Sequence, residues 1–171
     1  MVMTTSRPDS RRQVEISTAV LADPVHCLAL GFGAGLAPLA PGTFGSIVGL
    51  AVAALWSTQA WFVSAVAALA TTCVGIWICG ASARRLGVHD HPAIVWDEIA
   101  GMCITMLAAP PAWGWRWALA GFALFRIFDI VKPWPIREID HGMRGGVGIM
   151  LDDVLAGILA ALILLLIRYI T

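Results

Sequence analysis

Residues 60–80 read AWFVSAVAALATTCVGIWICG and contain no formally charged side chain. A helix needs ~20 apolar residues to span the hydrocarbon core of a bilayer, so this stretch predicts a membrane-spanning helix. The uncharged region around it is longer, because no Asp, Glu, Lys or Arg occurs between residues 27 and 83. Within it, residues 44–57 predict a shorter apolar helix, and Ser57-Thr58-Gln59 predicts the turn between the two helices.

The whole chain shares this apolar bias. Its 171 residues are 59% hydrophobic and 13% charged, and the mean hydropathy is +0.82. An average soluble domain is about 25% charged, and so few polar side chains cannot cover a globule of 18.2 kDa. The formal net charge is zero, which argues against a disordered polyelectrolyte and a basic nucleic-acid-binding protein. The bilayer is therefore the expected solvent.

We expect an all-α, polytopic membrane bundle with ~4–5 transmembrane or half-spanning helices. The predicted helices are 44–57, 60–81, 97–109, 117–131 and 152–170. Residues 27–43 contain too many Gly and Pro residues for a regular helix, so they predict a broken or re-entrant segment packed inside protein. Residues 1–25 predict a mobile cytoplasmic tail, and 26–171 predict one membrane-embedded domain.

Alternating helix directions place most basic residues on one side of the membrane. That side receives nine of the 11 Lys and Arg residues, namely Arg7, Arg11, Arg12, Arg84, Arg85, Arg126, Lys132, Arg137 and Arg144. The other side receives Arg116 and Arg168. Because basic residues concentrate on the cytoplasmic side of membrane proteins, the polar side is predicted to face the cytoplasm.

Three acidic positions lie at predicted helix ends on this same side: Asp97-Glu98, Asp129 and Asp152-Asp153. Carboxylates near apolar segments repel one another and resist desolvation. A hard divalent cation relieves both effects, and Mg²⁺ prefers carboxylate oxygens. We therefore expect Asp97, Glu98, Asp152 and Asp153 to hold one or two Mg²⁺ ions, although any one of these acids could be an ordinary helix cap.

Further polar residues near these acids suggest phosphate chemistry. Arg126, Asp129 and Lys132 share one helical stripe, which indicates either a phosphate clamp or an intrahelical ion-pair ladder. The glycine-rich segment before residue 44 predicts a phosphate cradle with hydroxyls from Thr43 and Ser46, or close helix packing through small residues. His89 could shuttle a proton, or it could be a solvated loop residue.

Four ordered motifs resemble the bacterial phosphatidylglycerophosphatase A family. They are GFGAGLAPLAPGTFGS (31–46), HDHPAIVWDEIAGM (89–102), FRIFDIVKPWPI (125–136) and GGVGIMLDDVLAG (145–157). The resemblance implies a Mg²⁺-dependent, multi-pass phosphatase of the bacterial inner membrane. It also implies hydrolysis of phosphatidylglycerol phosphate to phosphatidylglycerol and inorganic phosphate. The acidic positions that match its motifs are Asp97, Glu98, Asp129, Asp152 and Asp153.

On this reading we expect two sets of site residues on the cytoplasmic face. Catalytic roles fall to Asp97, Asp129, Asp153 and His89, and substrate binding falls to Arg126, Lys132, Thr43 and Ser46. The attacking group is either water or a carboxylate that forms an aspartyl-phosphate. The alternative function is a small transporter or channel whose intramembrane acids form an ion path. The sequence indicates no oligomeric state.

Overall fold

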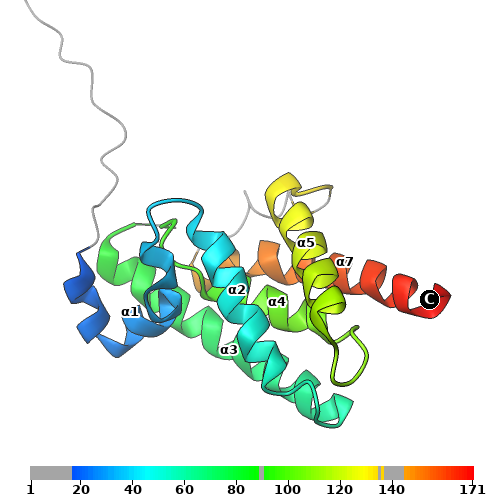
Figure 1. Ribbon diagram of the computed structural model, residues 1–171. Helices are drawn as coiled ribbons and strands as arrows, with labels where there is room; N and C mark the ends of the chain where they lie inside the picture. Colours follow the sequence, from blue (N-terminus) through cyan, green and yellow to red (C-terminus); the bar gives the residue numbers. More distant parts are fainter. Residues whose placement is uncertain (1–16, 89–90, 135, 137–144) are drawn as a thin grey trace, which may run out of the picture.

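The computed structural model describes residues 17–88, 91–134, 136 and 145–171, and the elements in these ranges are all helices (Figure 1). Three short helices come first: η1 (Thr18–Ala22), α1 (Pro24–Ala29) and η2 (Gly31–Leu36). Five longer helices follow: α2 (Pro41–Ala54), α3 (Trp61–Leu86), α4 (Trp96–Met106), α5 (Trp115–Val131) and α7 (Gly146–Ile170). The prediction of an all-α protein is confirmed.

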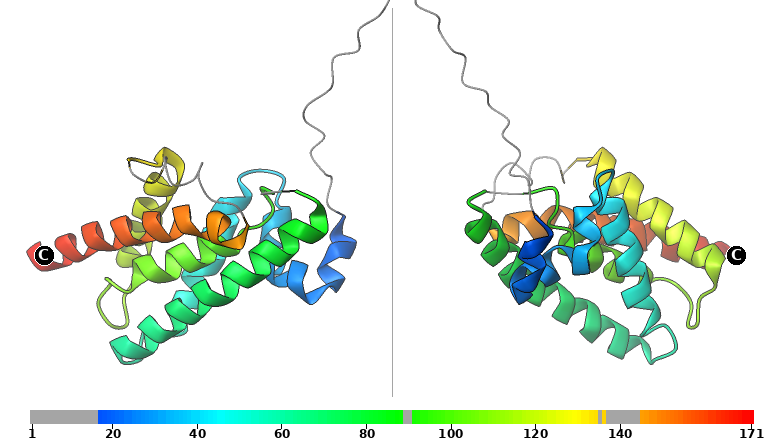
Figure 2. Two further views of the ribbon diagram at one scale, coloured as in Figure 1. Left: turned by 180° about the vertical axis from the view of Figure 1, so that it is seen from behind. Right: turned by 60° about the vertical axis from the view of Figure 1, so that its left-hand side comes forward.

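The centre of the bundle is α4, which contacts α2, α3, α5 and α7. Figure 2 shows α3 and α7 running across one side of the molecule with α4 between them, while α2 and α5 lie behind. Three large apolar side chains of α4 are buried: Ile99, Met102 and Met106. Close van der Waals packing against these side chains holds the surrounding helices to α4, and α4 in turn fixes where their ends meet.

Two helices, α3 and α7, are long and apolar enough to cross a membrane, and α2 is a shorter apolar helix. The outer face of α3 exposes Trp61, Phe62, Val66, Leu69 and Trp77, and that of α7 exposes Leu162, Leu165 and Leu166. Soluble proteins rarely expose apolar surface on this scale. Together with the composition, these faces identify the fold as a membrane helical bundle, as predicted.

The prediction of a broken segment over residues 27–43 is also confirmed. The helix α1 ends at Ala29, and η2 contains a kink at Phe32 and Gly33, whose φ angles are 58° and 98°. A second break occurs at Ala40, with φ of 49°, directly before α2. The segment is tied to the bundle centre, because the Val95 N–H donates to the Ala29 carbonyl at 2.9 Å.

Several helix ends differ from the predicted ranges. The helix predicted at 44–57 begins at Pro41, because proline suits the first turn of a helix. The helix predicted at 60–81 continues to Leu86, since its terminal arginines complement the helix dipole and Gly87 closes it with a φ of 70°. Residues 107–109, predicted as helix, form turns after α4.

The start of α7 is the main correction. The sequence analysis predicted a helix over 152–170 with the Asp152-Asp153 pair at its start, but α7 begins at Gly146. A Cβ at Gly146 would lie 1.8 Å from the Ile76 carbonyl oxygen of α3. The glycine therefore permits close contact between α7 and α3, and Asp152 and Asp153 lie almost two turns inside the helix.

Part of the predicted N-terminal tail is helical. Residues 18–22 form η1, which is capped by the Ser17 hydroxyl accepting from the Ala19 N–H. Asp23 then caps α1 by accepting from the Val25 N–H, and Pro24 occupies the first helical position. Capping side chains of this type stabilise a helix start by about 1 kcal/mol, so helical structure begins before residue 26.

Replacing Gly146 with alanine should destabilise the bundle. The new methyl group would collide with the α3 backbone, and such overpacking costs about 1–3 kcal/mol. The measurement is the unfolding midpoint in mild detergent. The matched control is Gly114→Ala. Gly114 directly precedes α5, as Gly146 begins α7, but it has nothing within 4 Å of its Cβ position. Equal midpoints for the two variants would contradict the prediction.

Candidate active site

Three carboxylates from two helices converge at the beginning of α4. Asp97 and Glu98 lie in its first turn, and Asp153 reaches them from α7. One carboxylate oxygen from each residue lies within 4.8 Å of the others. The group is largely removed from solvent, since Asp97 is 9% exposed and Asp153 is 3% exposed. We call Asp97, Glu98 and Asp153 the acidic triad.

The backbone around the triad is fixed by contacts to other helices. The Trp96 indole N–H donates to the Thr71 carbonyl of α3 at 3.0 Å, which orients the first turn of α4. The Thr105 hydroxyl lies 2.9 Å from the Gly101 carbonyl oxygen and 3.3 Å from the Gly157 carbonyl oxygen. This contact sets the register of α7 against α4 and so sets the position of Asp153 relative to Glu98.

Two oxygen atoms of the triad are buried without a hydrogen-bond partner: Glu98 Oε2 and Asp153 Oδ1. Leaving a buried polar atom unpaired costs about 1–3 kcal/mol, and more for a charged group. The carboxylates also repel one another in an environment with little water to screen them. A divalent cation would satisfy both oxygens and neutralise the repulsion. An all-carboxylate donor set suits a hard cation such as Mg²⁺.

Two ion pairs border the triad. Arg126 of α5 pairs with Asp129, and Lys132 at the end of α5 pairs with Asp152 of α7. Both Asp129 and Asp152 interact electrostatically with Asp153. Five carboxylates and two cations therefore occupy one region, and the Nε atom of Arg126 is buried there without a hydrogen-bond partner. This excess of negative charge favours the binding of cations.

The structure thus brings together most of the residues predicted for the site, with differences in detail. Asp97, Glu98 and Asp153 form the triad, while the predicted metal ligand Asp152 pairs with Lys132. Arg126, Asp129 and Lys132 surround the triad as two ion pairs. His89 falls outside the described residues.

The two predicted hydroxyl ligands lie on the first two turns of α2. Thr43 is half-buried, whereas Ser46 is fully buried and donates its hydroxyl proton to the Gly42 carbonyl oxygen at 2.8 Å. The Ser46 proton is thus used within the helix. Close packing explains the small residues of this segment, as the alternative interpretation of the sequence suggested, because a Cβ at Gly45 would lie 2.7 Å from the Val95 Cβ.

Gly42 belongs to the glycine-rich segment that predicted a phosphate cradle, but its contact with Glu98 was not predicted. A Cβ there would lie 2.2 Å from Glu98 Oε1 and 3.1 Å from Arg126 Nη1. The beginning of α2 therefore touches both the triad and the neighbouring arginine. The signal in the sequence was the glycine directly after Pro41, where a helix start offers backbone N–H groups and a partial positive charge.

Asp23 lies outside this region and provides a contrast. Its carboxylate accepts from the Val25 N–H at 2.9 Å and pairs with Arg85 at the molecular surface. The Val25 hydrogen bond is the main cause that lowers the pKa of Asp23, with a further contribution from Arg85. Of the six acidic residues in the described part of the chain, the other five all lie in or beside the triad.

Comparison with known proteins identifies relatives along nearly the whole chain. A model of the family described as Phosphatidylglycerophosphatase A matches residues 27–168. The chain is 44% identical to phosphatidylglycerophosphatase A of Escherichia coli (strain K12), over 90% of this chain and 88% of the relative. It is 45% identical to the Haemophilus influenzae protein of the same name, over 87% of this chain and 91% of the relative.

A third relative carries a different name. The putative phosphatidylinositol-3-phosphatase of Bacteroides thetaiotaomicron is 39% identical over 84% of this chain and 92% of its own length. No solved structure matches the chain.

Replacing Lys132 with methionine should destabilise the protein by about 1–2 kcal/mol. The substitution removes the ammonium group that pairs with Asp152, a carboxylate whose side chain is 12% exposed and which faces the charge of Asp153. The double variant Lys132→Met/Asp152→Asn should recover most of the loss. Denaturation midpoints of the four proteins in this cycle provide the measurement, and strictly additive effects would contradict the coupling.

Proposed function

The chain belongs to the phosphatidylglycerophosphatase A family and is a phosphatase, and from this premise we propose its substrate, cofactor and orientation. The substrate is phosphatidylglycerol phosphate, and the products are phosphatidylglycerol and inorganic phosphate. The reaction depends on Mg²⁺ and takes place at the cytoplasmic face of the bacterial inner membrane. The observation that carries the proposal is the convergence of the acidic triad with Arg126 and the beginning of α2.

The triad residues Asp97, Glu98 and Asp153 would hold the metal ion. The support is their donor chemistry, the 4.8 Å grouping of their oxygens and the two buried oxygens without partners. When bound, Mg²⁺ supplies neutralisation of phosphate charge and acidification of a nearby water. Asp152 remains with Lys132 at the border of the site and holds this cation in position.

Arg126 and Lys132 bind the phosphate oxygens. The Arg126 guanidinium carries five N–H donors, and its buried Nε–H is without a partner. Asp129 orients this guanidinium through their ion pair. The beginning of α2 adds favourable partial charge beside Arg126, because the N-terminus of a helix attracts anions. Phosphoryl transfer depends mainly on positioning and charge stabilisation, and these groups provide both.

His89 is proposed as the group that protonates the leaving glycerol oxygen, since an imidazole can donate a proton near neutral pH. In the sequence it lies between α3 and α4, the helix that carries Asp97. Arg126 and Lys132 stabilise the negative charge on the phosphate while the ester bond breaks. Thr43, on the first turn of α2, is proposed to contact a phosphate oxygen.

The proposed orientation rests on charge and on the helix ends. The beginning of α2, the beginning of α4 and the final turns of α5 meet at Gly42, Glu98 and Arg126. The end of α3 and the beginning of α7 meet at Gly80 and Gly146. Four of the six Lys and Arg residues in the described ranges, Arg84, Arg85, Arg126 and Lys132, belong to this end of the bundle, which supports its placement in the cytoplasm.

A transporter or channel receives less support from the arrangement of the acids. An ion path requires polar groups at successive depths across the bilayer. In the described part of the chain, five acids instead form a single group beside the beginning of α4. The convergence of these acids with two basic side chains suits a phosphate monoester better than a translocated ion.

Replacing Asp153 with asparagine should lower phosphate release from phosphatidylglycerol phosphate by about 100-fold or more, because the metal loses an anionic ligand. In wild-type protein, Mg²⁺ should raise the thermal midpoint relative to EDTA. In Asp153→Asn that rise should disappear. In EDTA the variant should be at least as stable as wild type, since one buried negative charge has been removed.

The matched control is Asp23→Asn, which removes a carboxylate outside the site. It should retain both turnover and the Mg²⁺-dependent rise in thermal midpoint. The same assay should be run with phosphatidylinositol-3-phosphate and phosphatidic acid to test the proposed substrate. Full activity of Asp153→Asn, or equal activity with and without Mg²⁺, would refute the metal assignment.

Gly42→Ala should lower kcat/KM by about 10- to 100-fold, because small displacements of site residues have effects of this size. The added methyl group must displace the Glu98 carboxylate, from which it would lie 2.2 Å. Gly114→Ala, which adds the same methyl group in open space, should keep full activity. The measurement is initial-rate kinetics on micellar substrate, and unchanged kinetics for Gly42→Ala would be inconsistent with the described contact.

A further inference from the structure

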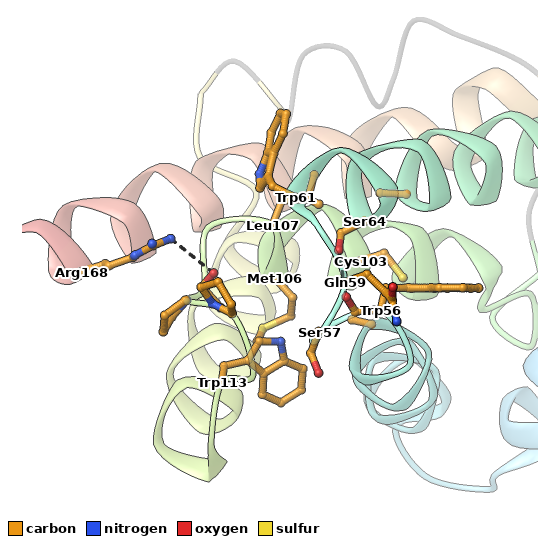
Figure 3. A pocket seen from close by; sticks show the side chains of 15 residues that line it. Trp56, Ser57, Gln59, Trp61, Ser64, Cys103, Met106, Leu107, Trp113 and Arg168 are labelled. Carbon is orange, nitrogen blue, oxygen red and sulfur yellow. Dashed lines mark hydrogen bonds between the residues drawn. The ribbon is translucent and has the colours of Figure 1, made fainter.

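A second polar feature lies at the opposite end of α4. A cavity of about 270 Å³ opens between the end of α2, the beginning of α3, the end of α4 and the last turns of α7. Figure 3 shows Trp56, Trp61, Trp113 and Arg168 around it. The acidic triad lies at the beginning of α4, whereas the α4 residues that line the cavity, Cys103 and Met106, lie toward its end. The cavity is therefore separate from the proposed active site.

The charged side chains at this end of the bundle have one sign. Residues 54–64, 103–116 and 162–171 contain two arginines, Arg116 and Arg168, and no Asp or Glu. Arg168 lines the cavity, while the Arg116 guanidinium stacks over the Trp115 ring at 5.6 Å outside it. A cation with no acidic side chain in these ranges to pair with it favours an anionic ligand.

The guanidinium of Arg168 has donors available for such a ligand. Its Nη1 atom lies 3.4 Å from the carbonyl oxygens of Ala108 and Ala109, which follow the end of α4. These contacts are long for hydrogen bonds, and they involve one nitrogen of a group with five N–H donors. They hold the guanidinium beside the cavity, and Figure 3 shows Arg168 with a dashed line that marks one such hydrogen bond.

The rest of the lining is typical of a lipid–water boundary. Tryptophan is enriched where one part of a side chain meets lipid and another meets water, and three tryptophans line this cavity. Ser57, Gln59 and Ser64 add polar groups beside them. Next to Arg168, α7 exposes Leu165 and Leu166 on its outer face. A polar recess therefore adjoins a surface on which acyl chains can lie.

We propose that this cavity binds the anionic headgroup of a phospholipid from the leaflet opposite the active site. Arg168 binds the lipid phosphate, the tryptophans surround the glycerol region, and an acyl chain follows the apolar face of α7. The volume is slightly below the usual range for ligand pockets, ~300–1,000 Å³, which suits a headgroup rather than a whole lipid. The apolar surroundings favour a lipid over a free anion.

Photo-crosslinking tests the proposal. The full chain is placed in phosphatidylcholine nanodiscs that contain a small, equal fraction of phosphatidylglycerol or phosphatidylcholine with a diazirine on its acyl chain. After irradiation, labelled peptides are mapped by mass spectrometry. The anionic probe should label residues 56–64 and 103–113 about fivefold more than the zwitterionic probe, because the choline cation offsets the phosphate charge in phosphatidylcholine and repels the Arg168 guanidinium.

Arg168→Gln should remove this preference for the anionic probe, and Arg168→Lys should retain most of it because the charge remains. The matched control Arg116→Gln removes the other cation at the same end and should keep the preference. Hydrolysis of micellar substrate should be unchanged in Arg168→Gln, which verifies that the variant is folded. Equal labelling by the two probes, loss of preference in Arg116→Gln, or competition by inorganic phosphate would each overturn the proposal.

Discussion

The close approach of desolvated carboxylates is the constraint on which this structure depends. Asp97, Glu98 and Asp153 would separate if their helices were free to move, because their charges repel one another and prefer water. They are held together by apolar packing around α4 and by contacts such as that of Thr105 with the α7 backbone. The bundle therefore stores unfavourable electrostatic energy that a bound cation can release.

Small residues make this approach possible. A Cβ at Gly157 of α7 would lie 2.5 Å from the Gly101 carbonyl oxygen of α4, and one at Gly42 would overlap Glu98. Helices in membranes associate largely through such close packing, since lipid supplies little hydrophobic force between them. The residues that bring the acids together are thus distinct from the acids, and they lie on three different helices.

Much of the fold could be predicted from the sequence, because apolar length and charge position constrain helices that lie in lipid. The long uncharged segment marked α3, and the shorter apolar run after Asp153 marked α7. The acidic residues marked the end of the bundle where the active site is proposed. The start of α7 was missed, since Gly146 is typical of a loop by composition but packs against Ile76. The pairing of Lys132 with Asp152 was missed as well, because it joins two helices whose rotation no local pattern reveals.

The length of α4 has a consequence for the surrounding bilayer. With 11 residues and ~1.5 Å of rise per residue, it spans about half of the ~30 Å hydrocarbon thickness. By the same arithmetic the 26 residues of α3 exceed that thickness. A protein built from such unequal lengths must tilt its long helices or deform the adjacent lipid. Its conformational energy is thereby coupled to acyl-chain length, so a change in membrane thickness would act directly on the geometry at both ends of its central helix.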